Sequence, residues 1–121
     1  GIHIDDEEGN LIVGSWGAVM EGWGTPELKG SLKSINIHTK EMKNLGKKPI
    51  GNLDGIEPDG KGSYYVTDWT GAKLYNINKK GKFKVIAEVG KGAADHEVII
   101  DKNLIIIPVM AEGKVIALKV K

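Results

Sequence analysis

Apolar and polar residues alternate in short runs that end at turns along the whole chain. In the clearest example, residues 53–71, two strand-like runs flank a tight turn at Asp59-Gly60. The second run is rich in β-branched and aromatic residues, which favour strands. The same order of strand, turn and strand occurs in residues 1–17 and 94–110. The pattern therefore predicts a repeated antiparallel unit.

Three such units account for the chain, with approximate boundaries 1–50, 51–90 and 91–121. We expect strands at 1–5, 11–16, 31–38, 44–50, 54–59, 63–69, 72–78, 82–89, 95–100, 104–110 and 114–120. Helical periodicity is weak, and 17 glycines interrupt the chain too often for long helices. The third unit ends before a fourth strand, and residues 17–30 form a longer loop within the first unit.

Units of about 40 residues with four antiparallel strands are typical of the blades of a β-propeller. A sandwich or a small barrel would also show short strands at regular spacing. The repeated order of whole units favours blades. We therefore predict an all-β fold of about three propeller blades, or half of a roughly six-bladed propeller.

Three blades do not close a ring, because propellers typically have about four to eight. Each blade buries its faces against its neighbours, so the two end blades would leave apolar faces and strand edges in water. We expect either that these are the last three blades of a longer protein or that two chains pair to close the ring. A cut fragment with no activity of its own is the remaining alternative.

The charged residues argue against some partners. All 17 basic residues are lysines, set against 16 acids, and the formal net charge is +1. Without arginine the chain lacks the side chain best suited to bidentate recognition of phosphate or guanine, so we expect no nucleic-acid partner. The longest apolar run, 104–110, is far shorter than the roughly 20 residues of a membrane-spanning helix, so we expect no membrane span.

The chain contains no cysteine, which excludes disulfides, thiolate metal sites and cysteine nucleophiles and leaves the compartment open. It does not begin with Met, and residues 1–5 already have the pattern of a strand. We expect it to begin inside a longer protein, with any signal peptide upstream of residue 1. A periplasmic or secreted location is compatible with this expectation.

Three short motifs carry a resemblance to a known family. They are Leu53-Asp-Gly-Ile-Glu-Pro-Asp-Gly, Tyr64-Tyr-Val-Thr-Asp-Trp-Thr-Gly and Gly92-Ala-Ala-Asp. On these residues the chain resembles, from end to end, the C-terminal half of a bacterial member of the senescence-marker protein, gluconolactonase and luciferin-regenerating enzyme family (regucalcin-like proteins). The resemblance implies a six-bladed propeller with a divalent metal ion, calcium or zinc, at the top of its central channel.

The resemblance implies one metal ligand in this chain, Asp54, whose Asp-Gly pair matches the pair that opens a later blade of the family. Gly1 would match the Gly of an Asn-Gly pair, so that the Asn would precede this chain; the other two ligands have no counterpart. A carboxylate at the start of an inner strand suits a hard cation, which takes oxygen ligands. Alternatively, Asp54 only caps the turn before Gly55.

Three tryptophans are candidate contacts for a lactone or sugar-like substrate. Trp16 and Trp69 end the second strands of the first two units at equivalent positions, and Trp23 lies on the long loop. Trp16 and Trp69 would stack on a substrate, or else pack between blades. Trp23 is the stronger candidate if its loop folds over the mouth of the channel.

Asp95 and His96 are expected to open the inner strand of the third unit, and His3 lies in that of the first. Adjacent strand residues face opposite ways, so only one of Asp95 and His96 can point into the channel, and the family motif favours Asp95. His96 could ligate zinc or act as a general base, or it could be a hydrogen-bonded structural residue. His3 is either structural or lines the channel.

Two functions follow as hypotheses. The first is a metal-dependent lactone or ester hydrolase in which Asp54 is a metal ligand or a catalytic proton acceptor. The second is a non-catalytic propeller that binds a protein or a small ligand across its top face. The fold alone does not decide between them.

Overall fold

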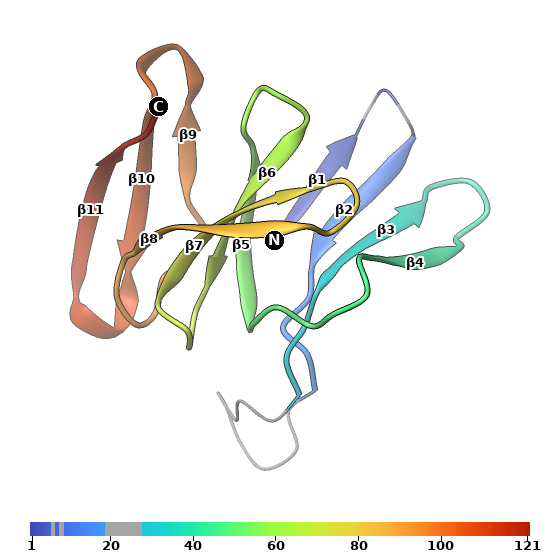
Figure 1. The fold of residues 1–121 in the computed structure, drawn as a ribbon, viewed down its shortest axis with the longest axis horizontal. Coiled ribbons are helices and arrows are strands. Elements are labelled where there is room, and N and C mark those ends of the chain that lie inside the picture. Colours follow the sequence, from blue (N-terminus) through green and yellow to red (C-terminus); the bar gives the residue numbers. More distant parts are fainter. Residues whose placement is uncertain (6, 8, 19–27) are drawn as a thin grey trace.

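The computed structural model describes residues 1–5, 7, 9–18 and 28–121. Figure 1 shows three antiparallel sheets side by side in the order of the sequence, and none of the described strands closes a sheet into a barrel. Consecutive sheets of this kind are propeller-like blades, and the all-β prediction is confirmed. No helix among the described residues is long and apolar enough to cross a membrane.

The spatial order of strands within each sheet follows the chain. Sheet 1 contains β1 (Ile2–Asp5), β2 (Asn10–Gly14), β3 (Leu32–Asn36) and β4 (Met42–Leu45). Sheet 2 contains β5 (Leu53–Pro58), β6 (Ser63–Asp68), β7 (Lys73–Asn78) and β8 (Phe83–Glu88). Sheet 3 contains β9 (Glu97–Ile99), β10 (Leu104–Val109) and β11 (Lys114–Lys119), with 3-10 turns η1 (Ile100–Lys102) and η2 (Met110–Glu112).

Most strand boundaries differ from the predicted ones by one or two residues, and two strands differ in a way that matters for the fold. The strand expected at 44–50 is β4, which starts earlier because the turn after β3 is made at Lys40, with φ 66°, and stops before Gly46, with φ 90°. The strand expected at 95–100 is β9, which starts at Glu97 and runs into η1. Asp95 and His96 therefore precede the inner strand of sheet 3 instead of opening it.

Two apolar cores fill the spaces between the sheets, and sheet 2 contributes to both. Its side chains alternate: Tyr64 and Val66 of β6 pack toward sheet 1, whereas Tyr65 packs toward sheet 3. The buried residues of the first core are Ile12, Leu32, Ile50, Leu53, Ile56, Tyr64, Val66, Tyr75 and Ile77. Those of the second are Leu74, Val89, Ala93, Ile105, Ile107 and Val109. Sheet 2 is thus covered on both faces, as an interior blade is.

Sheets 1 and 3 each have an outward face, called here an end face, that no described residue covers. Strand register puts six apolar residues on the end face of sheet 1: Ile2, Ile4, Leu11, Val13, Ile35 and Met42. The end face of sheet 3 has Ile99, Leu104, Ile106, Pro108, Val115 and Ala117. Ile2 is 66% exposed, Ile4 58% and Val115 67%. Both ends of the stack therefore present apolar sheet surface to solvent.

Candidate functional site

The first strands of the three sheets lie next to one another, with β5 in contact with β1 on one side and β9 on the other. A close approach of backbones sets this spacing at Gly55, where a Cβ atom would lie 2.8 Å from the Cα atom of Asp95. Only glycine fits between the two chains there. We call β1, β5 and β9 the inner strands, and the candidate site is built on them.

Asp54 lies on β5, between the chain's first residue and the segment before β9. The backbone nitrogen of Gly1 donates a hydrogen bond to the backbone carbonyl of Asp54, and the backbone of Asp95 lies close to the Asp54 carboxylate. Burial raises the pKa of Asp54, and the nearby Asp95 carboxylate raises it further. Asp54 is therefore a half-buried carboxylate whose charged form is disfavoured.

Two further acids lie beside Asp54 and Asp95, and the sequence did not single them out. Burial raises the pKa of Glu57, and the carboxylates of Glu97 and Asp95 raise it further. Strict alternation would place Asp54 and Glu57 on opposite faces of β5. The register of β5 shifts between Leu53 and Ile56, which changes this parity and lets both acids approach Asp95.

These four acids, Asp54, Glu57, Asp95 and Glu97, form what we call the carboxylate cluster. Their mutual repulsion favours proton or cation binding. Within the described ranges, however, no three His, Asp or Glu side chains are close enough together to hold a metal ion. The chain thus offers Asp54 as one candidate ligand, and a complete cation site would need further ligands.

His96 is buried, with 5% of its surface exposed, whereas Asp95 is exposed, so these neighbours face opposite ways. The His96 ring packs on Gly55, whose missing side chain leaves room for it: a Cβ atom there would lie 2.6 Å from Nδ1. The backbones of Tyr65 and Ala94 are close to the ring, but neither ring nitrogen makes a well-aligned hydrogen bond. Burial lowers the pKa of His96 to about 4, partly offset by Asp95. His96 is therefore neutral at pH 7.

The tryptophans lie at the junction of sheets 1 and 2. The rings of Trp16 and Trp69 contact each other, with centroids 6.3 Å apart and planes tilted by 56°. Both rings stay partly exposed. The Asn52 amide donates to the backbone carbonyl of Trp16 at 2.7 Å. The two residues therefore pack blade against blade, while Trp23 lies outside the described residues.

His3 faces sheet 2, where its ring lies 5.7 Å from that of Tyr64. Both line a cavity of about 140 Å³ between sheets 1 and 2. Asp5 lies in the same cavity and pairs with the Lys79 ammonium at 2.9 Å, which ties β1 to the turn after β7. His3 thus belongs to the junction between two sheets.

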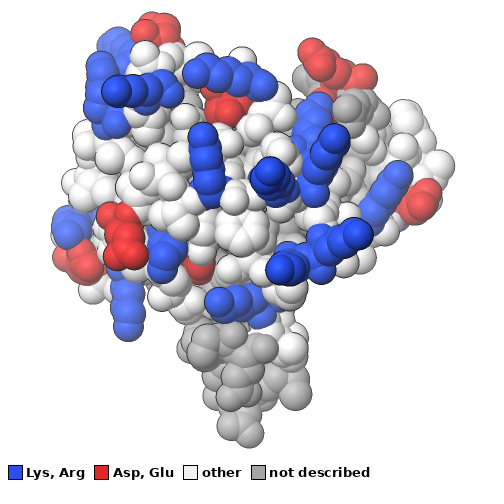
Figure 2. All heavy atoms as spheres, in the orientation of Figure 1, with Lys and Arg blue, Asp and Glu red and all other residues white. Residues whose placement is uncertain are grey.

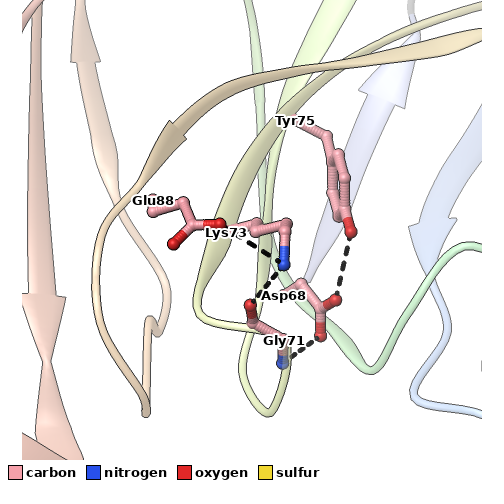
Figure 3. Close-up of polar contacts among 5 residues, drawn as sticks. All are labelled: Asp68, Gly71, Lys73, Tyr75 and Glu88. Atoms are coloured by element: carbon pink, nitrogen blue, oxygen red, sulfur yellow. Dashed lines mark hydrogen bonds and ion pairs between the residues drawn. The ribbon is translucent and has the colours of Figure 1, made fainter.

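Asp68, at the end of β6, was not among the residues selected from the sequence, although it lies within a family-like motif. Its buried carboxylate accepts hydrogen bonds from the backbone N–H groups of Asn52 at 3.0 Å and Gly71 at 3.1 Å and from the Tyr75 hydroxyl at 3.4 Å. Figure 3 shows Tyr75 and Gly71 converging on it, with Lys73 between the Gly71 carbonyl and Glu88. Burial, with Asp68 nearby, raises the pKa of Tyr75 to about 12. Asp68 organises the turn that follows β6.

The fold and this arrangement define a class: an all-β protein of consecutive antiparallel blades whose inner strands carry a cluster of carboxylates. Comparison of the chain with protein-family models, with curated proteins and with solved structures gives no match.

Proposed function

We propose that the chain forms three consecutive blades of a larger β-propeller and that the complete propeller is a metal-dependent lactone or ester hydrolase. The observation that carries the proposal is the position of Asp54 on the central inner strand, half-buried and beside the Asp95 carboxylate. The resemblance of the Asp54-Gly55 segment to the regucalcin-like family supports the same role.

In this proposal Asp54 is a ligand of a divalent cation, calcium or zinc. A carboxylate whose negative charge is disfavoured by burial and by another carboxylate gains most from a nearby cation. The cation would supply Lewis-acid polarisation of the substrate carbonyl. Asp95 lies next to Asp54 and is exposed, so it is the next candidate for contact with a small lactone or sugar-like substrate.

The remaining ligands come, in this proposal, from blades that cover the two end faces. Those blades belong either to a longer form of this chain or to a second copy, and they would bury the apolar rows that include Ile4 and Val115. The alternative is a non-catalytic propeller, or an inactive fragment, in which the carboxylate cluster has only a structural role.

The test is a metal titration of the protein in its native assembly, followed by thermal unfolding and by hydrolysis of a simple δ-lactone. We expect calcium or zinc to raise the melting temperature by several degrees, because a ligand that binds the folded state stabilises it. Asp54→Asn should abolish both this shift and the hydrolysis. Asp101→Asn, a matched change at an exposed acid in η1, should preserve both. A melting temperature that no metal shifts would leave the non-catalytic alternative.

A further inference from the structure

A second concave site lies between sheets 2 and 3, away from the carboxylate cluster. It is a cavity of about 400 Å³ whose lining includes Asp59, directly after the end of β5. Asp54 lies at the other end of the same strand, and five residues of extended chain span about 16 Å. The two sites are therefore separate.

The lining of this cavity has an apolar part and a polar part. Ile86 of β8 faces Leu118 and Val120 across the gap, as part of the second core. On sheet 2, Tyr65, Asn76 and Lys84 are successive cross-strand partners, so they form one row on the face toward sheet 3. A ligand in the cavity would meet apolar surface on one side and hydrogen-bonding groups on the other.

The one acidic side chain in the lining is already engaged. The Asp59 carboxylate accepts hydrogen bonds from the backbone N–H groups of Lys61 at 2.7 Å and Ser63 at 3.0 Å and from the Asn76 amide at 3.0 Å. Burial tends to raise the pKa of Asp59, but these bonds and the Lys61 charge outweigh it, so the pKa is lowered. Asp59 is therefore ionised, and its oxygens hold the turn before β6 in place.

The lysines of the lining are not engaged in this way. Lys61 and Lys84 line the cavity, and neither forms an ion pair within the part of the chain that the structure describes. Lys119 also borders it, but its pairing with Leu104 turns its side chain toward the end face of sheet 3. Lys121 also lines the cavity. In Figure 2 lysine side chains gather around the C-terminal end of the chain. The lining thus has an excess of positive charge.

We propose that this cavity binds a small organic anion, in which an oxyanion group of a phosphate or carboxylate meets Lys61 and Lys84 and an apolar body rests against Ile86 and Leu118. Ammonium groups on flexible stems bind such oxyanions as point charges, and the charge-assisted hydrogen bonds are stronger than neutral ones. The cavity volume lies within the range of small-molecule sites.

The probe is phenyl phosphate, followed by two-dimensional amide NMR of the protein. We expect saturable shifts confined to residues around the cavity, including the amides of Tyr65, Lys84 and Leu118. Benzoate distinguishes a carboxylate site from a phosphate site. Phenol and inorganic phosphate, each of which supplies half of the proposed interaction, should bind at least tenfold more weakly than phenyl phosphate.

The double variant Lys61→Gln/Lys84→Gln should weaken phenyl phosphate binding at least tenfold. Both lysines are exposed, so the fold is preserved. The control is Lys47→Gln/Lys48→Gln, which removes the same charge from an exposed turn after β4 and should leave the affinity unchanged. Equal weakening by the two double variants, or no weakening by the first, would overturn the proposal. Asp54→Asn should not alter this binding, so the outcome is independent of the metal site.

Discussion

At the residue scale, burial determines what His96 can do. A neutral imidazole fits against Gly55 without a hydrogen bond, whereas an imidazolium there would be charged with no aligned acceptor. The charged group that faces it is the Asp95 carboxylate, which favours protonation. Protonation of His96 and burial of its ring therefore compete.

This competition predicts a pH dependence of stability. Because the pKa of His96 falls from 6.5 to about 4 on folding, its contribution is fully present above pH 6.5 and is lost as the pH falls toward 4. The linkage amounts to at most about 3 kcal/mol over this range. We expect His96→Leu to flatten the loss of unfolding free energy between pH 6.5 and 4, measured by urea denaturation.

Asp54 and Glu57 have the opposite effect on the pH dependence, because folding raises the pKa of both carboxyl groups. Their contribution to the unfolding free energy is present at low pH and is lost as the pH rises through their titration. The comparison of variant with wild type at each pH removes their contribution. His38→Leu, at an exposed position in the turn before β4, is the matched control and should keep the wild-type profile. If the His96→Leu variant loses as much unfolding free energy between pH 6.5 and 4 as the wild type, this loss does not come from His96.

The sequence identified some residues of the site and missed others for a physical reason. Asp54 and Asp95 stand in short motifs beside glycine and alanine, and such local signals are visible in the chain. Glu57 joins them only because the register of β5 shifts, and no local pattern shows that shift. Asp68 gains its role from Asn52 and Tyr75, which lie 16 and 7 residues away. Contacts of this kind depend on how strands pair.

At the scale of the element, the alternation of apolar and polar residues predicted the positions of most strands closely. The strands of the second unit were predicted most accurately, because each of its turns contains a glycine, in an Asp-Gly, Thr-Gly or Lys-Gly pair, and its strands have a buried face. β4 was misplaced because most of its residues are exposed and carry no apolar alternation. β8 is an edge strand of sheet 2, and its lysines keep such an edge from pairing with another chain.

One hydroxyl group joins two of these elements. Thr67 of β6 is fully buried; its Oγ1 accepts a hydrogen bond from the backbone N–H of Gly55 at 2.9 Å and donates to the carbonyl of Ala94 at 2.9 Å. Thr67→Val would leave both backbone groups buried and unpaired, at a cost of about 1–3 kcal/mol of unfolding free energy. We expect this loss in urea denaturation, together with faster hydrogen exchange at the Gly55 amide.

The variant Thr67→Ser separates the contribution of the Thr67 hydroxyl to stability from that of its methyl group. It keeps both hydrogen bonds and removes one buried methyl, so it should cost less than Thr67→Val and leave exchange at Gly55 slow. If the two variants lose the same stability, the methyl group and not the hydrogen bonds joins sheet 2 to sheet 3.

At the scale of the whole molecule, the end faces make the 121-residue chain prone to self-association. Sedimentation velocity should show the weight-average mass rising with concentration above 13.1 kDa. Ile4→Lys should reduce this association, because it charges the end face of sheet 1 at a site that is already 58% exposed. The control is Val85→Lys, at a site 51% exposed on β8 and outside both end faces.

If the chain stays monomeric at every concentration, exposing the end faces to water costs little free energy. This result would remove the argument for further blades. A Val85→Lys variant that dissociates as readily as Ile4→Lys would place the contact elsewhere.

The division of the apolar interior into two cores determines how the protein unfolds. Among the described residues, sheets 1 and 3 share no core, since each contributes to only one of the two cores, together with sheet 2. In a one-dimensional array of this kind, cooperativity passes only between neighbours, and either outer sheet can melt while the other core survives. Partly unfolded forms that keep the middle sheet and one partner are therefore built into the architecture, and the amides of β6 and β7 should be the last to exchange with solvent.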